Sequence, residues 1–107
     1  MTQAGADQIV AHVGLTTAGS IGAGVAYTLE EAIEKVMTIM AAARAVRPDI
    51  LVICHGGPFD EPENVGTALK QMVGINGFFG ASSIERLPTE RAISGQVRAF
   101  KSLALAG

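Results

Sequence analysis

The chain has 107 residues, the size of one domain, and 49% of them are hydrophobic, with a mean hydropathy of +0.36 that is enough for a packed core. A net charge of −2, with eight scattered Lys and Arg residues, excludes the basic surface that a nucleic-acid partner requires. The single cysteine, Cys54, excludes an intrachain disulfide and lies in an apolar run, where we predict an inert buried thiol. No Cys/His spacing predicts a metal site, and we expect a reducing, cytoplasmic location.

Residues 9–29 carry no charged side chain, yet they do not form a membrane span. Four glycines and several hydroxyl residues lower both the helix propensity and the apolarity of the segment. The first residues also lack the charged and apolar regions of a signal peptide. We therefore expect no membrane partner.

Three short apolar runs predict β-strands, each followed by a loop with glycine and then by a helical pattern. The runs are Ile9–Val13, Ile50–Cys54 and Ile75–Phe79. Continuous Val/Ile runs are typical of parallel strands that are covered on both faces. Because strand–helix–strand crossovers are right-handed, the three strands should lie side by side in chain order in an α/β fold.

The helical segments have recognisable ends. Thr28 and Glu31 have capping-box spacing and predict a helix that ends before Pro48. A second helix is predicted to begin at Asp60–Pro62 and a third near Pro88. The apolar positions expected to pack on the sheet are Leu29, Ile33, Val36, Met40, Ala43, Val65, Ala68, Leu69, Met72, Ile93, Val97, Phe100 and Ala104.

The loops after parallel strands meet at one edge of the sheet, where α/β proteins bind ligands. Both histidines and most of the glycines belong to these loops or to the strand ends before them. In the last loop, Ser82 or Ser83 with Glu85 predicts a capped helical turn before the longer helix. The loops are residues 14–27, 55–60 and 80–87.

Two of these loops predict a phosphate or carboxylate site. Glycine-bearing loops after consecutive strands, the second leading into a helix start, match the phosphate site of many barrels. Helix-start N–H groups favour an anion, and glycine lets it approach the backbone. The predicted binding residues are Gly56, Gly57, Gly80, Ala81, Ser82, Ser83, Arg86, Thr16 and Thr17, although the two threonines equally suit an ordinary loop.

The candidate catalytic residues each have a structural alternative. His55 and His12 lie at predicted strand ends and are general acid–base candidates, or else a turn histidine and a core histidine. Glu85 is a catalytic candidate or a helix cap. Arg86 contacts the anion or forms a surface ion pair.

Four segments together resemble a known family: "AGAD" (4–7), "VAHVGLTTAGSIGA" (10–23), "RAVRPDILVICHGGP" (44–58) and "GFFGASSIERLPTERAI" (77–93). They are similar to the carboxy-terminal part of the phosphoenolpyruvate hydrolase-like TIM-barrel family, also described as TIM-barrel signal-transduction proteins. The resemblance covers nearly the whole chain. It implies a (β/α)8 barrel distantly like the phosphoenolpyruvate mutase and isocitrate lyase group.

The length implies only part of such a barrel. A full barrel takes about 250 residues, so this chain is expected to form about three of the eight units, as a single partial domain over residues 1–107. The resemblance places the magnesium ligands of the mutase group on earlier strands, outside this chain, which leaves the cofactor unknown. Unpaired strand edges favour association, so we expect homo-oligomers or pairing with the remainder of the barrel.

Three functions remain open from the sequence. The first is a hydrolase or lyase acting on a small phosphorylated or carboxylated acid, with this chain supplying the anion site and inactive when isolated. The second is a non-catalytic barrel that binds such an anion. The third is a segment that contributes only barrel structure or assembly.

Overall fold

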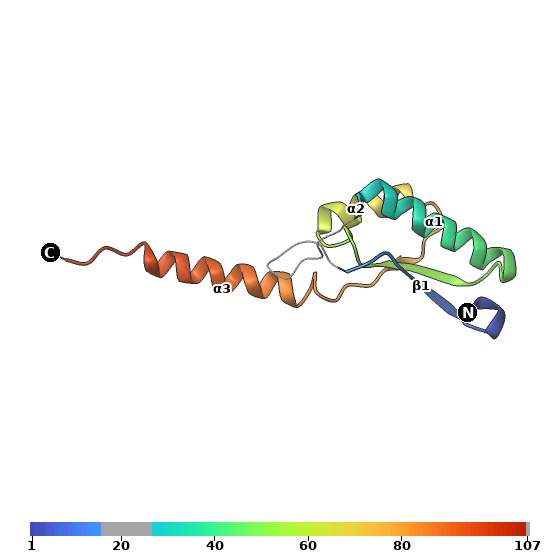
Figure 1. Ribbon diagram of the computed structural model, residues 1–107, viewed down its shortest axis with the longest axis horizontal. Coiled ribbons are helices and arrows are strands. Elements are labelled where there is room, and N and C mark those ends of the chain that lie inside the picture. Colours follow the sequence, from blue (N-terminus) through green and yellow to red (C-terminus); the bar gives the residue numbers. More distant parts are fainter. Residues whose placement is uncertain (16–26, 107) are drawn as a thin grey trace.

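The computed structural model describes residues 1–15 and 27–106, which form a three-stranded parallel sheet, three α-helices and a short 3-10 helix. The strand order β1-β2-β3 confirms the predicted order, and α1 and α2 lie over one face of the sheet (Figure 1). This α/β arrangement is compatible with part of a TIM barrel. The elements are η1 (Thr2–Ala4), β1 (Gln8–His12), α1 (Leu29–Val46), β2 (Leu51–His55), α2 (Pro62–Gln71), β3 (Gly77–Phe78) and α3 (Arg86–Lys101).

The pairing of β1 with β2 forms the centre of the sheet. It is parallel and runs over five residue pairs, from Gln8 opposite Leu51 to His12 opposite His55. The second pairing is short, since only Gly77 and Phe78 of β3 lie opposite Ile53 and Cys54.

A side chain explains why β3 is shorter than the predicted run of residues 75–79. The Asn76 side-chain Oδ1 accepts a hydrogen bond from Val52 N at 2.8 Å, at the place where a ladder carbonyl would accept it. The Asn76 backbone N donates to Val52 O at 2.8 Å. Arg44 holds the amide in place by donating from Nη2 to Asn76 Oδ1 at 3.1 Å. At Asn76, therefore, one of the two hydrogen bonds to Val52 is made by the side chain and the other by the backbone.

Only one face of the sheet is covered in the described part of the chain, so the prediction of strands covered on both faces is wrong. Burial alternates along β1, where Ile9 and Ala11 are buried and Val10 is exposed. Leu51 and Phe79 are also about half exposed. The buried side chains pack against α1 and α2, whereas no described element packs on the opposite, apolar face.

The first two helices follow the sequence pattern. The Thr28 hydroxyl accepts from Glu31 N at 3.2 Å and Glu31 Oε2 accepts from Thr28 N at 2.8 Å, which confirms the capping box at the start of α1. In α2, Pro62 occupies the first turn as predicted. The predicted core positions of both helices are buried or partly buried except Leu69, which is exposed; the buried ones are Ile33, Val36, Met40, Ala43, Val65, Ala68 and Met72.

The third helix differs from the prediction in its start and in its packing. It begins at Arg86, not at Pro88, and its only buried residue is Leu87. The predicted core positions Ile93, Val97 and Phe100 are more than half exposed, and Ala104 lies beyond the helix and is exposed. Figure 1 shows the reason: α3 runs away from the sheet instead of folding back on it.

The projecting helix gives the molecule its elongated shape. The extents are 73 × 24 × 24 Å and the radius of gyration is 18.2 Å, against about 13 Å for a compact domain of this length. A two-pronged ion pair between Arg91 of α3 and Glu61, which precedes α2, joins the two helices. This hydrogen-bonded arginine lowers the pKa of the Glu61 carboxyl.

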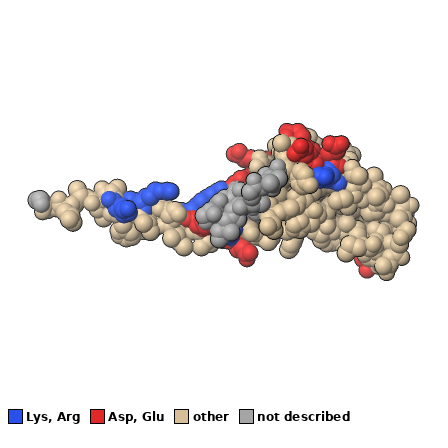
Figure 2. All heavy atoms as spheres, in the orientation of Figure 1, with Lys and Arg blue, Asp and Glu red and all other residues tan. Residues whose placement is uncertain are grey.

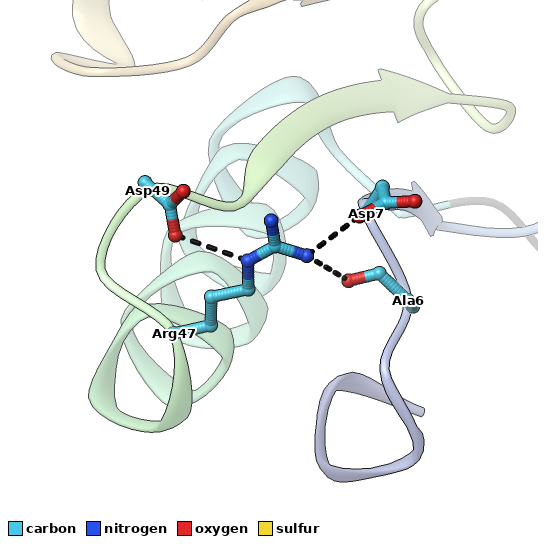
Figure 3. A network of polar contacts seen from close by, with 4 residues as sticks. All are labelled: Ala6, Asp7, Arg47 and Asp49. Carbon is cyan, nitrogen blue, oxygen red and sulfur yellow. Dashed lines mark hydrogen bonds and ion pairs between the residues drawn. The ribbon is translucent and has the colours of Figure 1, made fainter.

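Arg47 joins the segment before β1 to the segment before β2 (Figure 3). Its Nη1 donates to Asp7 Oδ1 at 2.8 Å and to Ala6 O at 3.1 Å, and its Nε donates to Asp49 Oδ1 at 3.0 Å. The hydrogen bond from Arg47 lowers the pKa of Asp49, and the Asp7 hydrogen bond is the main cause of a raised pKa at Arg47. Four residues of the family-like segments thus join the starts of the two strands.

Replacing Arg47 by alanine should destabilise the fold in a pH-dependent way. Because the pKa of Asp49 is lowered from its ordinary value of 3.8, its stabilising contribution is present above that value and is lost as the pH falls below it. The urea midpoint of Arg47→Ala should therefore be lower than that of the wild type near neutral pH, and the difference should shrink in acid. Arg98→Ala, which removes the same charge from the exposed end of α3, is the control. An Arg47→Ala deficit of equal size at both pH values would contradict this account.

Candidate functional site

The carboxyl ends of the three parallel strands meet at one edge of the sheet, which is where such sheets bind ligands. In the described residues this edge consists of the ends of β1 and β2, the turn at residues 56–60 and the segment from Phe79 to Glu85. Thr16 and Thr17 lie outside the described residues, so their predicted part in the site stays a prediction.

The two histidines lie next to each other at this edge. His12 and His55 are opposite each other in the β1–β2 register, and their ring centroids are 4.9 Å apart with the planes at 72°. The ring of Phe79 lies 4.8 Å from that of His55. All three residues are at least partly exposed. His12 occupies a strand position that is not buried under the helices, and it also borders a cavity beside α1.

Each histidine is oriented by a backbone hydrogen bond. Gly14 N donates to His12 Nδ1 at 3.2 Å, and His55 Nδ1 donates to Phe79 O at 2.7 Å. Neither Nε2 atom has a described hydrogen-bond partner. The general acid–base role of the two residues stays a prediction, but the structure places both rings within reach of one small molecule.

The two glycines after His55 are required by backbone packing. Gly56 and Gly57 have φ of +82° and +56°, and a Cβ on them would lie 2.1 Å from Gly14 O and 2.7 Å from Val13 O. Gly57 N also donates to Gly14 O at 2.9 Å. The amide of Gly57 is thus bonded to Gly14 O and is not available to an anion. The two glycines have a structural role whether or not an anion binds beside them.

The second wall of the predicted site is a turn that leads directly into α3. Ile84 N and Glu85 N donate to Ala81 O at 2.9 and 3.0 Å, and Leu87 N donates to Ser82 O at 2.8 Å. The predicted capping box between Ser82 and Glu85 is wrong, because the backbone carbonyl of Ala81 takes the amide of Glu85. Glu85 itself is the N-cap residue of α3 without a side-chain cap.

The remaining residues of this wall are close to the turn. Ser82 and Ser83 are partly exposed, and a Cβ on Gly80 would lie 2.7 Å from the Ile84 side chain. Arg86 forms an ion pair with Glu90 at 3.0 Å, as in the predicted alternative to a contact with an anion. Contact of these residues with an anion stays a prediction.

Cys54 lies beneath the site. It is buried, and its burial raises the pKa of the thiol. This confirms the predicted buried thiol and removes it from the candidates for a nucleophile.

The sequence did not predict a cavity of about 840 Å³ between the end of β1 and the first half of α1. His12 lines it together with Glu31, Glu34 and Lys35. Lys35 lies 4.7 Å from the ring centroid of Tyr27, a cation–π distance. The spacing of Glu31 and Lys35 places them on one helix face, but only the fold shows that this face borders β1. Two carboxylates against one ammonium make the α1 wall of this cavity unsuitable for an anion.

The described residues contain no group of three or more His, Cys, Asp or Glu side chains arranged to hold a metal ion. In the same ranges, no helix has the length and apolarity needed to cross a bilayer.

The sequence profile of the family described as "Phosphoenolpyruvate hydrolase-like" matches residues 1–103. The chain belongs to the phosphoenolpyruvate hydrolase-like family. It is 51% identical over 105 residues, 98% of its length, to two Solanum lycopersicum proteins, "ToMV susceptible protein tm-1(GCR26)" and "ToMV resistance protein Tm-1(GCR237)". A Sinorhizobium fredii protein, y4pA, is 30% identical over 100 residues, 94% of the chain. The match spans 14% of each tomato protein and 16% of the bacterial one.

Within this phosphoenolpyruvate hydrolase-like chain, Gly56→Ala should be strongly destabilising. The substitution combines a left-handed backbone with a backbone clash at Gly14 O, and we expect a loss of about 2–4 kcal/mol. Gly66→Ala is the matched control, because a Cβ at Gly66 in α2 meets nothing within 4 Å. The control should stay within about 1 kcal/mol of the wild type, on the stabilising side. Urea unfolding followed by circular dichroism measures both, and equal stabilities would rule out the packing requirement.

Proposed function

We propose that the carboxyl edge of this sheet binds the phosphate or carboxylate group of a small acid, as one part of a phosphoenolpyruvate hydrolase-like barrel. The observation that carries the proposal is the pairing of His12 with His55 at the ligand-binding edge, in a chain whose family name describes chemistry on such an acid. The site would lie between residues 55–57 and residues 80–83, with Arg86 and the two serines as further donors.

In this proposal the chain supplies the anion end of the site. The hydrolytic or lytic step on the bound acid needs residues that the resemblance places on other strands of the barrel. A magnesium ion, if the longer protein uses one, would be held there as well. The single buried Cys54 suits a cytoplasmic, reducing location for such a protein.

Phosphate should shift the amide resonances of residues 55–57 and 80–83 in a saturable way at millimolar concentration. The two loops respond together because both would contact the same anion. Sodium chloride at the same ionic strength is the control for screening. If phosphate leaves both loops unmoved, the anion site does not exist in this chain.

A second candidate function, assembly with other copies of the chain, has its own observation. Two groups of exposed apolar side chains have no described partner: Val10 and Leu51 on the open sheet face, and the stripe of Ile93, Val97 and Phe100 on α3. From Arg91 onward α3 carries basic residues and no acidic one. Figure 2 shows acidic side chains over the body of the molecule and near the start of α3, whereas the far end of α3 carries basic ones. The apolar stripe of α3 in one copy could thus pack on the open sheet face of another, with the basic residues of α3 near the acidic side chains of that copy.

Sedimentation should therefore give a mass above the 11.0 kDa of one chain. Val97→Glu places a charge in the apolar stripe of α3 and should shift the population toward monomer. Ser94→Glu adds the same charge on the exposed helix, about a quarter turn from the centre of the Ile93–Val97–Phe100 stripe, and should not shift the population. A monodisperse wild-type monomer would count against self-assembly.

A further inference from the structure

We propose that His12 and His55 are held in opposite tautomers, so that His12 Nε2–H donates and His55 Nε2 accepts when one small hydroxy acid bridges the two rings. The ligand class rests on the proposed function, whereas the tautomers follow from the geometry of the chain alone.

The partner of His12 fixes its tautomer. A backbone amide can only donate, so Gly14 N must donate to a lone pair on His12 Nδ1, at 3.2 Å. A neutral imidazole has one hydrogen on its two nitrogens, and in His12 this hydrogen is therefore on Nε2. Gly14 has a φ of +102°, a conformation that glycine adopts without a Cβ penalty and that lets its amide turn back on the ring.

The partner of His55 has the opposite effect. A backbone carbonyl can only accept, so His55 Nδ1 must carry the hydrogen that it donates to Phe79 O at 2.7 Å. The lone pair of the neutral ring is then on Nε2.

The two rings thus offer one hydrogen-bond donor, His12 Nε2–H, and one acceptor, His55 Nε2, side by side at the carboxyl edge of the sheet. They come from paired positions on β1 and β2, and their centroids are 4.9 Å apart. Gly56 is required beside the pair, because a Cβ there would lie 2.1 Å from the carbonyl oxygen of Gly14, the residue whose amide orients His12.

The pair suits a ligand that carries a hydroxyl beside an acceptor oxygen, such as a 2-hydroxy acid. The hydroxyl would donate to His55 Nε2 and a carboxylate oxygen would accept from His12 Nε2–H. In a proton transfer, the ligand O–H bond breaks and an N–H bond forms at His55 Nε2. The ring becomes a cation, and His12 remains neutral while its hydrogen bond stabilises the ligand anion. The Nδ1–H of His55 remains on Phe79 O throughout.

The tautomers can be read from long-range ¹H–¹⁵N correlations of the imidazole nitrogens, at a pH where imidazole is ordinarily neutral. The chain has two histidines, so single variants assign the spectrum. We expect an unprotonated Nδ1 in His12 and an unprotonated Nε2 in His55. The same tautomer in both rings would overturn the pair, even if anions bind.

The ligand class is tested by comparing glycolate with acetate, which lacks the hydroxyl. Glycolate should bind about tenfold more tightly, the effect of one added hydrogen bond. Asparagine places its amide near the position of Nδ1, so His12→Asn and His55→Asn keep a partner for Gly14 N and Phe79 O but lack Nε2. Each should fold. His55→Asn should lose the preference for glycolate, whereas His12→Asn should weaken the binding of both acids and keep the preference. Equal binding of the two acids by the wild type would overturn the hydroxy-acid assignment.

The outcomes separate this inference from the proposed function. Opposite tautomers without binding of phosphate, acetate or glycolate would overturn the anion site and the ligand class, and leave the tautomer pair standing. Anion binding with identical tautomers would overturn the tautomer pair and leave the anion site standing.

Discussion

The parallel pairing of β1 with β2 is the constraint on which the rest of the structure depends. It sets His12 opposite His55 and turns Ile9, Ala11, Val52 and Cys54 toward the helices. Since side chains alternate along a strand, a slip of one residue would exchange the two faces. Arg47 at the start of the strands and the Gly57–Gly14 backbone hydrogen bond at their end oppose such a slip from both sides.

The features that the sequence predicted well are encoded within a few residues of each other. Thr28 and Glu31 are three residues apart and form the capping box that their spacing indicates. The three strands, their order and the core face of α1 follow from short apolar runs and helical spacing, because each pattern reports the local periodicity of burial. The family itself was recognisable because long segments of the chain carry it.

The features that the sequence did not predict depend on distant partners. An apolar stripe on α3 indicates that a helix can be covered, but not that a covering layer lies nearby. Among the described residues, Val97 and Phe100 are more than half exposed. The glycines after His55 indicate a turn, yet only the fold shows Gly14 O at the position where their Cβ would be. The tautomer proposed for His55 likewise depends on Phe79, which follows a different strand.

The smallest strand of the sheet has a consequence for how the site behaves as a unit. Only two residues of β3 pair with β2. Side-chain hydrogen bonds add to this pairing at both ends, from Val52 N to Asn76 before the strand and from His55 to Phe79 O after it. The imidazole of His55, which would exchange a proton with a ligand, therefore also binds the segment that directly follows β3. A change in what His55 binds could be transmitted as a small slide of β3, and with it of the Ser82–Ser83 turn and the root of α3. Chemistry at the sheet edge and the direction of the projecting helix would then be mechanically linked.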